Sequence, residues 1–220
     1  MRVLGIDPGL GRCGWAVVER AAGSTTALGY GTVHTRGEAV APRLAELAAR
    51  LREVVARFQP DSCAIERLFV NANVRTAMTV GQASGVALLT AAEQGLPVAS
   101  YTPSQVKRAV TGTGAAPKAQ IGYMVRALLD LDVTPTPADT ADALAVALCH
   151  LYHATSPGSL RDSSAIKASG RGGGGRRRGP GDPRAAEDGA GGPGETGGLA
   201  AASEADWLAR VAPTSPWRGP

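Results

Sequence analysis

Aromatic side chains are scarce in this chain of 220 residues, because Phe, Trp and Tyr together make up 4% of it. A core with so few rings must rely on Ala, Val and Leu, and the hydrophobic content of 44% is sufficient for one. Cysteine is also rare, with three isolated residues and no CxxC pair. This pattern indicates neither a zinc site nor a disulfide framework, and it favours a reducing cytoplasm.

Long apolar runs are missing as well. No stretch of about 18 apolar residues predicts a membrane span. The opening segment MRVLGIDPG reaches Asp7 without the apolar run of a signal peptide. We therefore expect no membrane partner. The net charge of +4 and the pI near 9.2 permit a polyanionic partner without requiring one.

The composition changes sharply near residue 156. Residues 156–220 hold 15 of the 29 glycines and 7 of the 15 prolines, with no sustained apolar period. Such a segment cannot bury enough surface to offset the entropy of ordering it. The sequence therefore predicts a folded domain over 1–155 and a disordered Gly/Pro/Arg-rich tail over 156–220. The run RGGGGRRRG in this tail is either a basic arm for a phosphate backbone or sequence without a function.

Hydrophobic periodicity predicts strands that alternate with helices along the folded part. The first three strands form an antiparallel meander, and later strands return by helical crossovers. The fold class is therefore α/β, with a mixed five-stranded sheet flanked by helices. Both ribonuclease H-like and actin-like ATPase folds match this plan, and the fold alone does not choose between them. We expect strands at 2–7, 15–20, 28–35, 62–66 and 97–101, and helices at 42–58, 74–94, 103–110, 117–130 and 137–154.

Two carboxylates follow apolar strands. Asp7 ends the first strand before Pro8-Gly9, and Glu66 ends the strand CAIE. The carboxyl ends of strands in open α/β sheets are where ligands bind, so both side chains are candidates for one site. Alternatively, Asp7 only stabilises an Asp-Pro-Gly turn and Glu66 is a solvated strand end.

Two further carboxylates, Asp139 and Asp142, lie three residues apart in TPADTADALA. On a helix they face the same way, roughly 5–6 Å apart. Asp139 has an alternative role at the capping-box position if Thr136 is the N-cap and Pro137 the first helical residue. Asp142 is harder to explain structurally, because it shares its side of the helix with apolar residues.

A metal centre explains the four acids better together than separately. Clustered carboxylates repel, and their pKa values rise unless a cation neutralises them. Oxygen-only ligands select Mg²⁺, or Mn²⁺ in its place, rather than zinc. Two such ions can activate a water and stabilise the leaving oxygen of a phosphodiester. The sequence therefore predicts a two-metal phosphodiesterase site.

Four segments together resemble one known family: GIDPGLGRCGWAVV, FQPDSCAIERLFVNANVRTAMTVGQASGVAL, SQVKRAVTGTGAAPKAQIGYMV and ADTADALAVAL. They resemble the RuvC family of bacterial crossover junction endodeoxyribonucleases, over about residues 2–153. The resemblance implies a ribonuclease H-like homodimer that resolves four-way Holliday junctions by symmetric, Mg²⁺-dependent cleavage of two strands in recombination and repair. It also implies a partnership with the RuvA and RuvB branch-migration proteins.

The family's functional residues carry over by motif position. Lys107 in SQVKRAV and Lys118 in APKAQ would contact the scissile or a neighbouring phosphate, and Phe69 in ERLFVNAN would stack on a base opened at the crossover. Their alternatives are solvated lysines and a core phenylalanine. The resemblance implies that the catalytic and metal-binding acids are Asp7, Glu66, Asp139 and Asp142.

Other functions remain open at this point. A related nuclease group that processes ribosomal RNA precursors shares the opening GID strand, but the close pair of aspartates and the Phe69 segment favour the junction resolvase. An actin-like ATPase or sugar kinase would need a second domain and a second phosphate loop, for which 155 residues are too few. A junction-binding protein without catalysis would not need all four acids.

Overall fold

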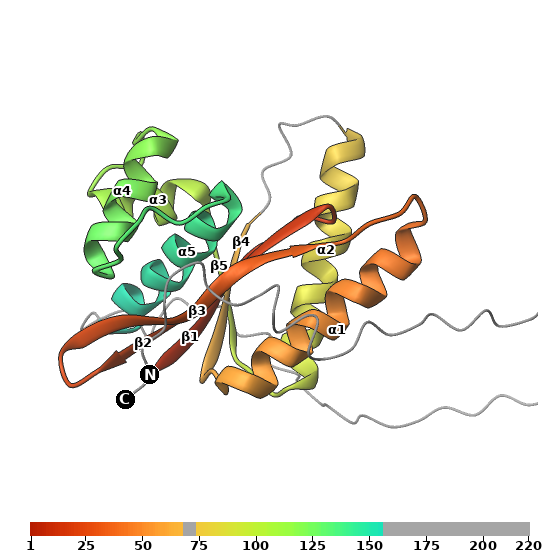
Figure 1. Cartoon of the computed structure of the whole chain (residues 1–220), viewed down its shortest axis with the longest axis horizontal. Coiled ribbons are helices and arrows are strands. Elements are labelled where there is room, and N and C mark those ends of the chain that lie inside the picture. The colour runs from red at the N-terminus through yellow and green to blue at the C-terminus, as the bar shows by residue number, and fades with distance from the viewer. Residues whose placement is uncertain (68–73, 156–220) are drawn as a thin grey trace, which may run out of the picture. The chain divides into compact units, whose positions relative to one another are not determined.

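The computed structural model describes residues 1–67 and 74–155, which form one mixed sheet with helices on both faces (Figure 1). Neighbours in the sheet follow the order β3-β2-β1-β4-β5. β1, β2 and β3 pair antiparallel, whereas β4 is parallel to both β1 and β5. The expected mixed five-stranded sheet is therefore confirmed. The strands are β1 (Arg2–Asp7), β2 (Arg12–Ala21), β3 (Ser24–His34), β4 (Ser62–Glu66) and β5 (Val98–Tyr101).

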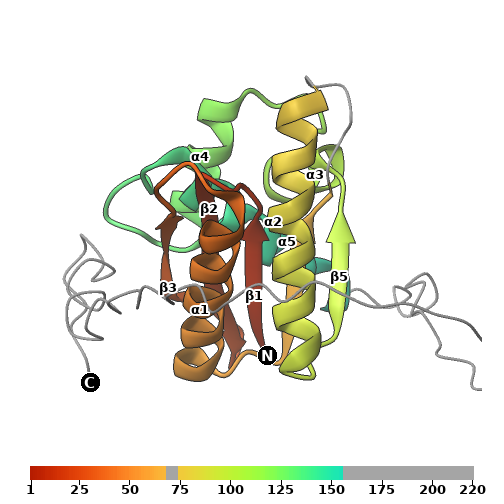
Figure 2. The same cartoon turned by 90° about the vertical axis from the view of Figure 1, so that its right-hand side faces the viewer.

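In Figure 2 the orange and yellow helices cover the near face of the sheet, and the green and blue-green helices lie behind it. Every predicted helix is present, with bounds that differ by at most two residues. Phe69 and the predicted tail over 156–220 lie outside the described residues. The helices are α1 (Val40–Phe58), α2 (Val74–Glu93), α3 (Pro103–Thr111), α4 (Lys118–Leu128) and α5 (Ala138–Thr155).

Helices α1 and α5 differ in how much of their surface is apolar. α1 has one apolar stripe, of which Leu47, Leu51, Val54 and Val55 are buried. In α5 every residue from Ala143 to Cys149 is fully buried. A helix that is apolar on all sides belongs inside a protein, which places α5 between the sheet and the pair formed by α3 and α4.

The alternation of side chains along the strands decides which residues face α5. Val3, Ala16 and Ala64 belong to the hydrophobic cluster that contains α5. Side chains two positions apart point to the same face of a sheet. Asp7 at the end of β1 and Glu66 at the end of β4 therefore share the face that carries α5.

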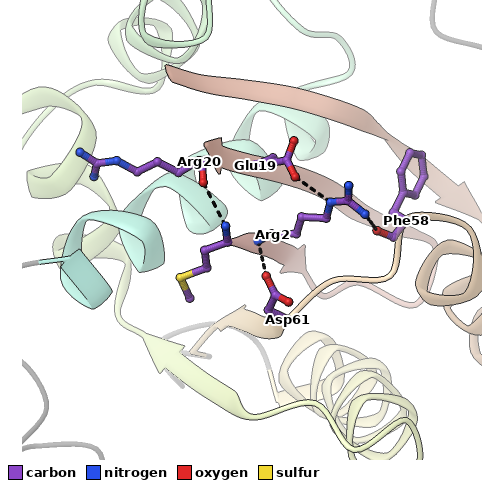
Figure 3. Close-up of polar contacts among 6 residues, drawn as sticks. Arg2, Glu19, Arg20, Phe58 and Asp61 are labelled. Atoms are coloured by element: carbon purple, nitrogen blue, oxygen red, sulfur yellow. Dashed lines mark hydrogen bonds and ion pairs between the residues drawn. The ribbon is translucent and has the colours of Figure 1, made fainter. Parts of the chain in front are cut away.

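Polar contacts fix the start of β1 and the end of β2, at the edge of the sheet opposite to Asp7 and Glu66 (Figure 3). The backbone N–H of Arg2 donates to Asp61 Oδ2 at 2.7 Å, and its guanidinium donates to Glu19 Oε1 at 2.8 Å and to the carbonyl of Phe58 at 3.2 Å. The amino group of Met1 donates to the carbonyl of Arg20 at 3.0 Å. Because these contacts join β1 to β2 and to the α1–β4 connection, they hold the register in which both acidic strand ends lie together.

The start of α5 differs from its prediction. The helix begins at Ala138, and the N–H of Thr140 donates to the carbonyl of Pro137 at 3.0 Å. Thr136 is therefore not the N-cap, and the capping-box role of Asp139 is wrong. Asp139 still lies in the first turn, where the helix dipole favours a negative charge.

Among the helices of the described residues, none has both the length and the apolar character that a bilayer span requires. The three cysteines are buried and form no disulfide, so they act as small apolar side chains.

Candidate active site

Asp7 and Glu66 meet at one edge of the sheet. β1 and β4 are parallel neighbours, with Ile6 beside Ile65, so the residue that follows each isoleucine ends its strand at the same level. Both carboxylates are half-buried. The pairing of the strands therefore explains why two acids distant in sequence occupy one place.

Two glycines let α5 bring its acids to this edge. A Cβ on Gly14 of β2 would overlap the backbone oxygen of Asp139, and a Cβ on Gly5 of β1 would overlap that of Ala143. The absence of side chains at these two positions allows the helix backbone to rest directly on the strands. Asp139 and Asp142, one helical turn apart, are thereby held beside Asp7.

The electrostatics show that the four acids share one site. The pKa of Asp7 is raised to about 7, chiefly by burial and then by the nearby charges of Glu66, Asp142 and Asp139, in that order of importance. Burial also raises the pKa of Glu66 to about 7, with Asp142 as the second cause. Such mutual repulsion in a partly dry site is relieved by protons or by cations.

Basic side chains already supply part of this relief. Lys118 Nζ lies 2.6 Å from Asp142 Oδ2, a contact that raises the pKa of the lysine. The positive charge of Lys118 lowers the pKa values of Asp7 and Glu66, and that of Lys107 lowers the pKa of Glu66. Lys118 thus contacts an acid directly, whereas Lys107 acts on Glu66 only through its charge.

Arg12 is a third basic residue at the site, and the sequence analysis missed it. Its Nε lies 3.3 Å from Asp139 Oδ2. As the first residue of β2, Arg12 shares its face of the sheet with Gly14, on which Asp139 rests. The only signal in the sequence was its place just after the GIDPG segment, in what looked like a turn.

Polar contacts hold the connection that follows Asp7. The hydroxyl of Thr35 donates to the carbonyl of Leu10, and Arg43 Nε donates to the same hydroxyl at 3.0 Å. These bonds join the β1–β2 turn to the end of β3 and the start of α1. They limit how far the turn can move when a ligand arrives.

The chemistry of the four acids fits a hard divalent cation. All the donors are carboxylate oxygens, and a cation among them would lower the raised pKa values of Asp7 and Glu66. No group of three or more His, Cys, Asp or Glu side chains within residues 1–67 and 74–155 is arranged to hold a metal ion as it stands. Asp139 and Asp142 are each paired with a basic side chain, Arg12 and Lys118 respectively.

The family is shown by comparison with known proteins. The model of the family described as crossover junction endodeoxyribonuclease RuvC matches residues 3–150. The chain belongs to this family. It is therefore an endodeoxyribonuclease of crossover junctions, and the RuvC family consists of metal-dependent nucleases. The alternatives of an ATPase, a kinase and a binding protein without catalysis are thereby set aside.

The chain aligns with nearly the whole length of the following RuvC relatives. The Streptomyces avermitilis protein is 50% identical over 171 residues, which cover 77% of this chain and 97% of the relative. The Moorella thermoacetica protein is 54% identical over 151 residues, with 68% and 90% covered. The solved structure of Thermus thermophilus RuvC in complex with a Holliday junction substrate is 40% identical, covers 70% of this chain and 94% of its own, and has a TM-score of 0.66. The ribonuclease H-like fold expected from the sequence is confirmed.

Proposed function

We propose that the RuvC-like domain over 1–155 resolves Holliday junctions through a metal centre held by Asp7, Glu66, Asp139 and Asp142. The observation that carries this proposal is the meeting of all four carboxylates on the α5 face of the sheet, where Asp7 is influenced by the other three. Mg²⁺ is the proposed ion, with two per site and Mn²⁺ as a substitute, because every donor is a carboxylate oxygen.

The bound ions would supply an activated water and neutralise charge at the scissile phosphate. The protein's own part is to hold the four oxygens in place and to present cations to the DNA. Lys118 contacts an acid from the start of α4, and the charge of Lys107 acts on Glu66 from α3. Once Asp142 binds a metal, Lys118 can contact a phosphate oxygen instead, since an ammonium group binds phosphate as a point charge. Phe69 lies outside the described residues, and its stacking on an opened base stays a prediction.

The acid cluster is tested by Asp142→Asn. The amide keeps the shape of the side chain and removes an anionic ligand, so cleavage of a synthetic four-way junction in Mg²⁺ should fall to background. Binding of the junction should largely persist, because shape and phosphate contacts carry it. Asp132→Asn is the matched control, since Asp132 is exposed and lies outside the cluster. Normal cutting by Asp142→Asn at saturating Mg²⁺ would refute the proposed centre.

A homodimer is part of the proposal. Resolution into two duplexes needs symmetric nicks in two strands, and a two-fold dimer supplies one metal centre for each. Helix α2 offers a surface for the second copy: Ala83, Ala87, Thr90 and Ala91 are buried within the chain, whereas the opposite side is exposed. That exposed side, here called the α2 face, consists of Val74, Met78, Gly81, Gly85, Leu88 and Leu89.

The α2 face fits a second copy because its large apolar side chains are exposed on one side of the helix. Met78 is 62% exposed and Leu89 is 57% exposed. Gly81 and Gly85 lie between them and would let two helices approach closely. Ala83 and Ala87 of the same helix pack inside the chain and are therefore not part of this face.

Two remaining expectations belong to the same proposal. A resolvase acts on the junction that branch migration moves, so we propose RuvA and RuvB as partners of this chain. We place the protein in the cytoplasm, which the three unpaired thiols support because a reducing compartment preserves them.

A further inference from the structure

Arg12 occupies an unusual place between the acids and the solvent. Its side chain is 60% exposed, whereas that of its partner Asp139 is 21% exposed. The guanidinium therefore lies between the acid cluster and the solvent, at the start of β2. Lys118 approaches the same cluster from α4, so the two α5 acids are paired with cations from different elements.

The carboxylate oxygen that Arg12 approaches, Asp139 Oδ2, has few other polar contacts to offset its burial. Asp139 Oδ2 is buried and accepts no hydrogen bond from the part of the chain that the structure describes. A buried carboxylate oxygen without a hydrogen bond is costly, and a cation at 3.3 Å offsets this cost only in part. This oxygen can therefore accept a hydrogen bond or bind a cation.

We propose that Arg12 is an exchangeable partner of Asp139, paired with this acid in the metal-free enzyme and released to a backbone phosphate of the junction when a metal is bound. The inference rests on the proposed function, because it takes Asp139 as a metal ligand. It adds Arg12 to the DNA-binding residues and links DNA binding to the state of the metal centre.

The geometry favours an exchange by side-chain motion alone. Arg12 begins β2, where it is registered with His34 of β3, and the bonds of Thr35 hold the preceding turn. The backbone at Arg12 is therefore fixed, while the long and largely exposed side chain is able to change rotamer. A divalent cation on Asp139 would repel the guanidinium, and the planar guanidinium fits a phosphate by two parallel hydrogen bonds.

Two effects of opposite sign follow for Arg12→Gln, which retains polarity and removes the charge. Without DNA, the variant should bind metal more tightly, because a competing cation has been removed. A largely exposed ion pair is weak, so the gain should be about two- to fivefold. With a metal bound, the variant should bind the junction less tightly, because one phosphate contact has been lost.

Metal binding is measured by titrating the full chain with Mn²⁺ and following the free ion by electron paramagnetic resonance, without DNA. Arg57→Gln is the matched control, because Arg57 is an exposed arginine of α1 that stacks on Phe58 at the far end of the sheet. We expect a tighter Mn²⁺ dissociation constant for Arg12→Gln alone. An unchanged or weaker constant in a variant that melts like the wild type would overturn the exchange.

Junction binding is measured by fluorescence anisotropy on a labelled four-way junction, over a range of salt, in EDTA and in Ca²⁺, with gels to show that the DNA is intact. We expect Arg12→Gln to lose about three- to tenfold in affinity in Ca²⁺ with a shallower salt dependence, and clearly less in EDTA, where the wild-type arginine is occupied by Asp139. Equal losses in the two conditions, or no loss, would contradict the proposal.

Wild-type protein separates this inference from the function on which it rests. If the wild type fails to bind the four-way junction or Mn²⁺, the proposed function itself fails. If the wild type binds both and Arg12→Gln matches Arg57→Gln in every measurement, only the role of Arg12 is lost.

Discussion

The ammonium group of Lys118 lies 2.6 Å from Asp142 Oδ2, so the first residue of α4 contacts an acid in the first half of α5. This contact joins the α3–α4 pair to the edge of the sheet at which the four acids lie. Lys118, which is expected to contact the DNA, is thus paired with a carboxylate of the acid cluster.

Replacing Lys118 by Gln should change both the chemistry and its pH dependence. The positive charge lowers the pKa values of Asp7 and Glu66, so its removal should raise both and move Mn²⁺ binding to higher pH. Loss of a phosphate contact should reduce single-turnover cleavage by about 10²-fold. Lys107→Gln is the comparison, because its charge acts on Glu66 and should give a smaller pH shift. Identical pH profiles for the wild type and Lys118→Gln would contradict this reading.

The stability of the metal-free protein should fall as the pH rises from about 4 to about 7. In the unfolded chain Asp7 and Glu66 lose their protons near pH 4, whereas folding raises both pKa values to about 7. Within this window the folded state binds more protons than the unfolded state, so raising the pH favours unfolding. Thermal melts in EDTA should show this decline, and saturating Mg²⁺ should reduce it. Asp7→Asn should show a flatter decline in EDTA than the wild type, and an equal slope would be evidence against the assignment.

Gly14→Ala should damage both stability and cleavage. The added methyl group would overlap the backbone oxygen of Asp139 and push α5 away from β2. Overpacking of this kind costs about 1–3 kcal/mol of the free energy of unfolding. Gly11→Ala is the control, since its Cβ would make an ordinary contact of 3.5 Å with Arg43. Urea denaturation and junction cleavage measure the two effects, and equal stability of both variants would show that α5 does not rest on this strand as described.

Sequence reasoning located the acids because their positions follow from local rules. Strand ends, the alternation of side chains and the three-residue spacing on a helix are properties of short segments. The role of Arg12 could not be predicted in this way, because it depends on the docking of α5 against Gly14, a contact between distant segments. The start of α5 was predicted wrongly because Thr136-Pro137 has the composition of a helix start, although the helix begins at Ala138.

The α2 face should hold two copies together. Leu89→Glu places a charge on this face and should convert the dimer to a monomer in sedimentation velocity experiments, because an unpaired buried charge is costly. Val133→Glu is the matched control, since Val133 is also 57% exposed but lies outside α2. The monomeric variant should lose paired nicks while its fold is retained. Dimers formed equally by both variants would place the contact elsewhere.

The packing of α5 against β1 joins the last described helix to the first strand, since Gly5 and Ala143 touch across almost the whole domain sequence. During synthesis on a ribosome, Asp7 emerges early and Asp142 among the last residues of the domain. A chain that is still being synthesised contains Asp7 and Glu66 before it contains Asp139 and Asp142. Contacts between such distant segments form late in folding. A nascent chain that ends before α5 therefore lacks two of the four acids, and the proposed metal centre can form only after the whole domain has been synthesised.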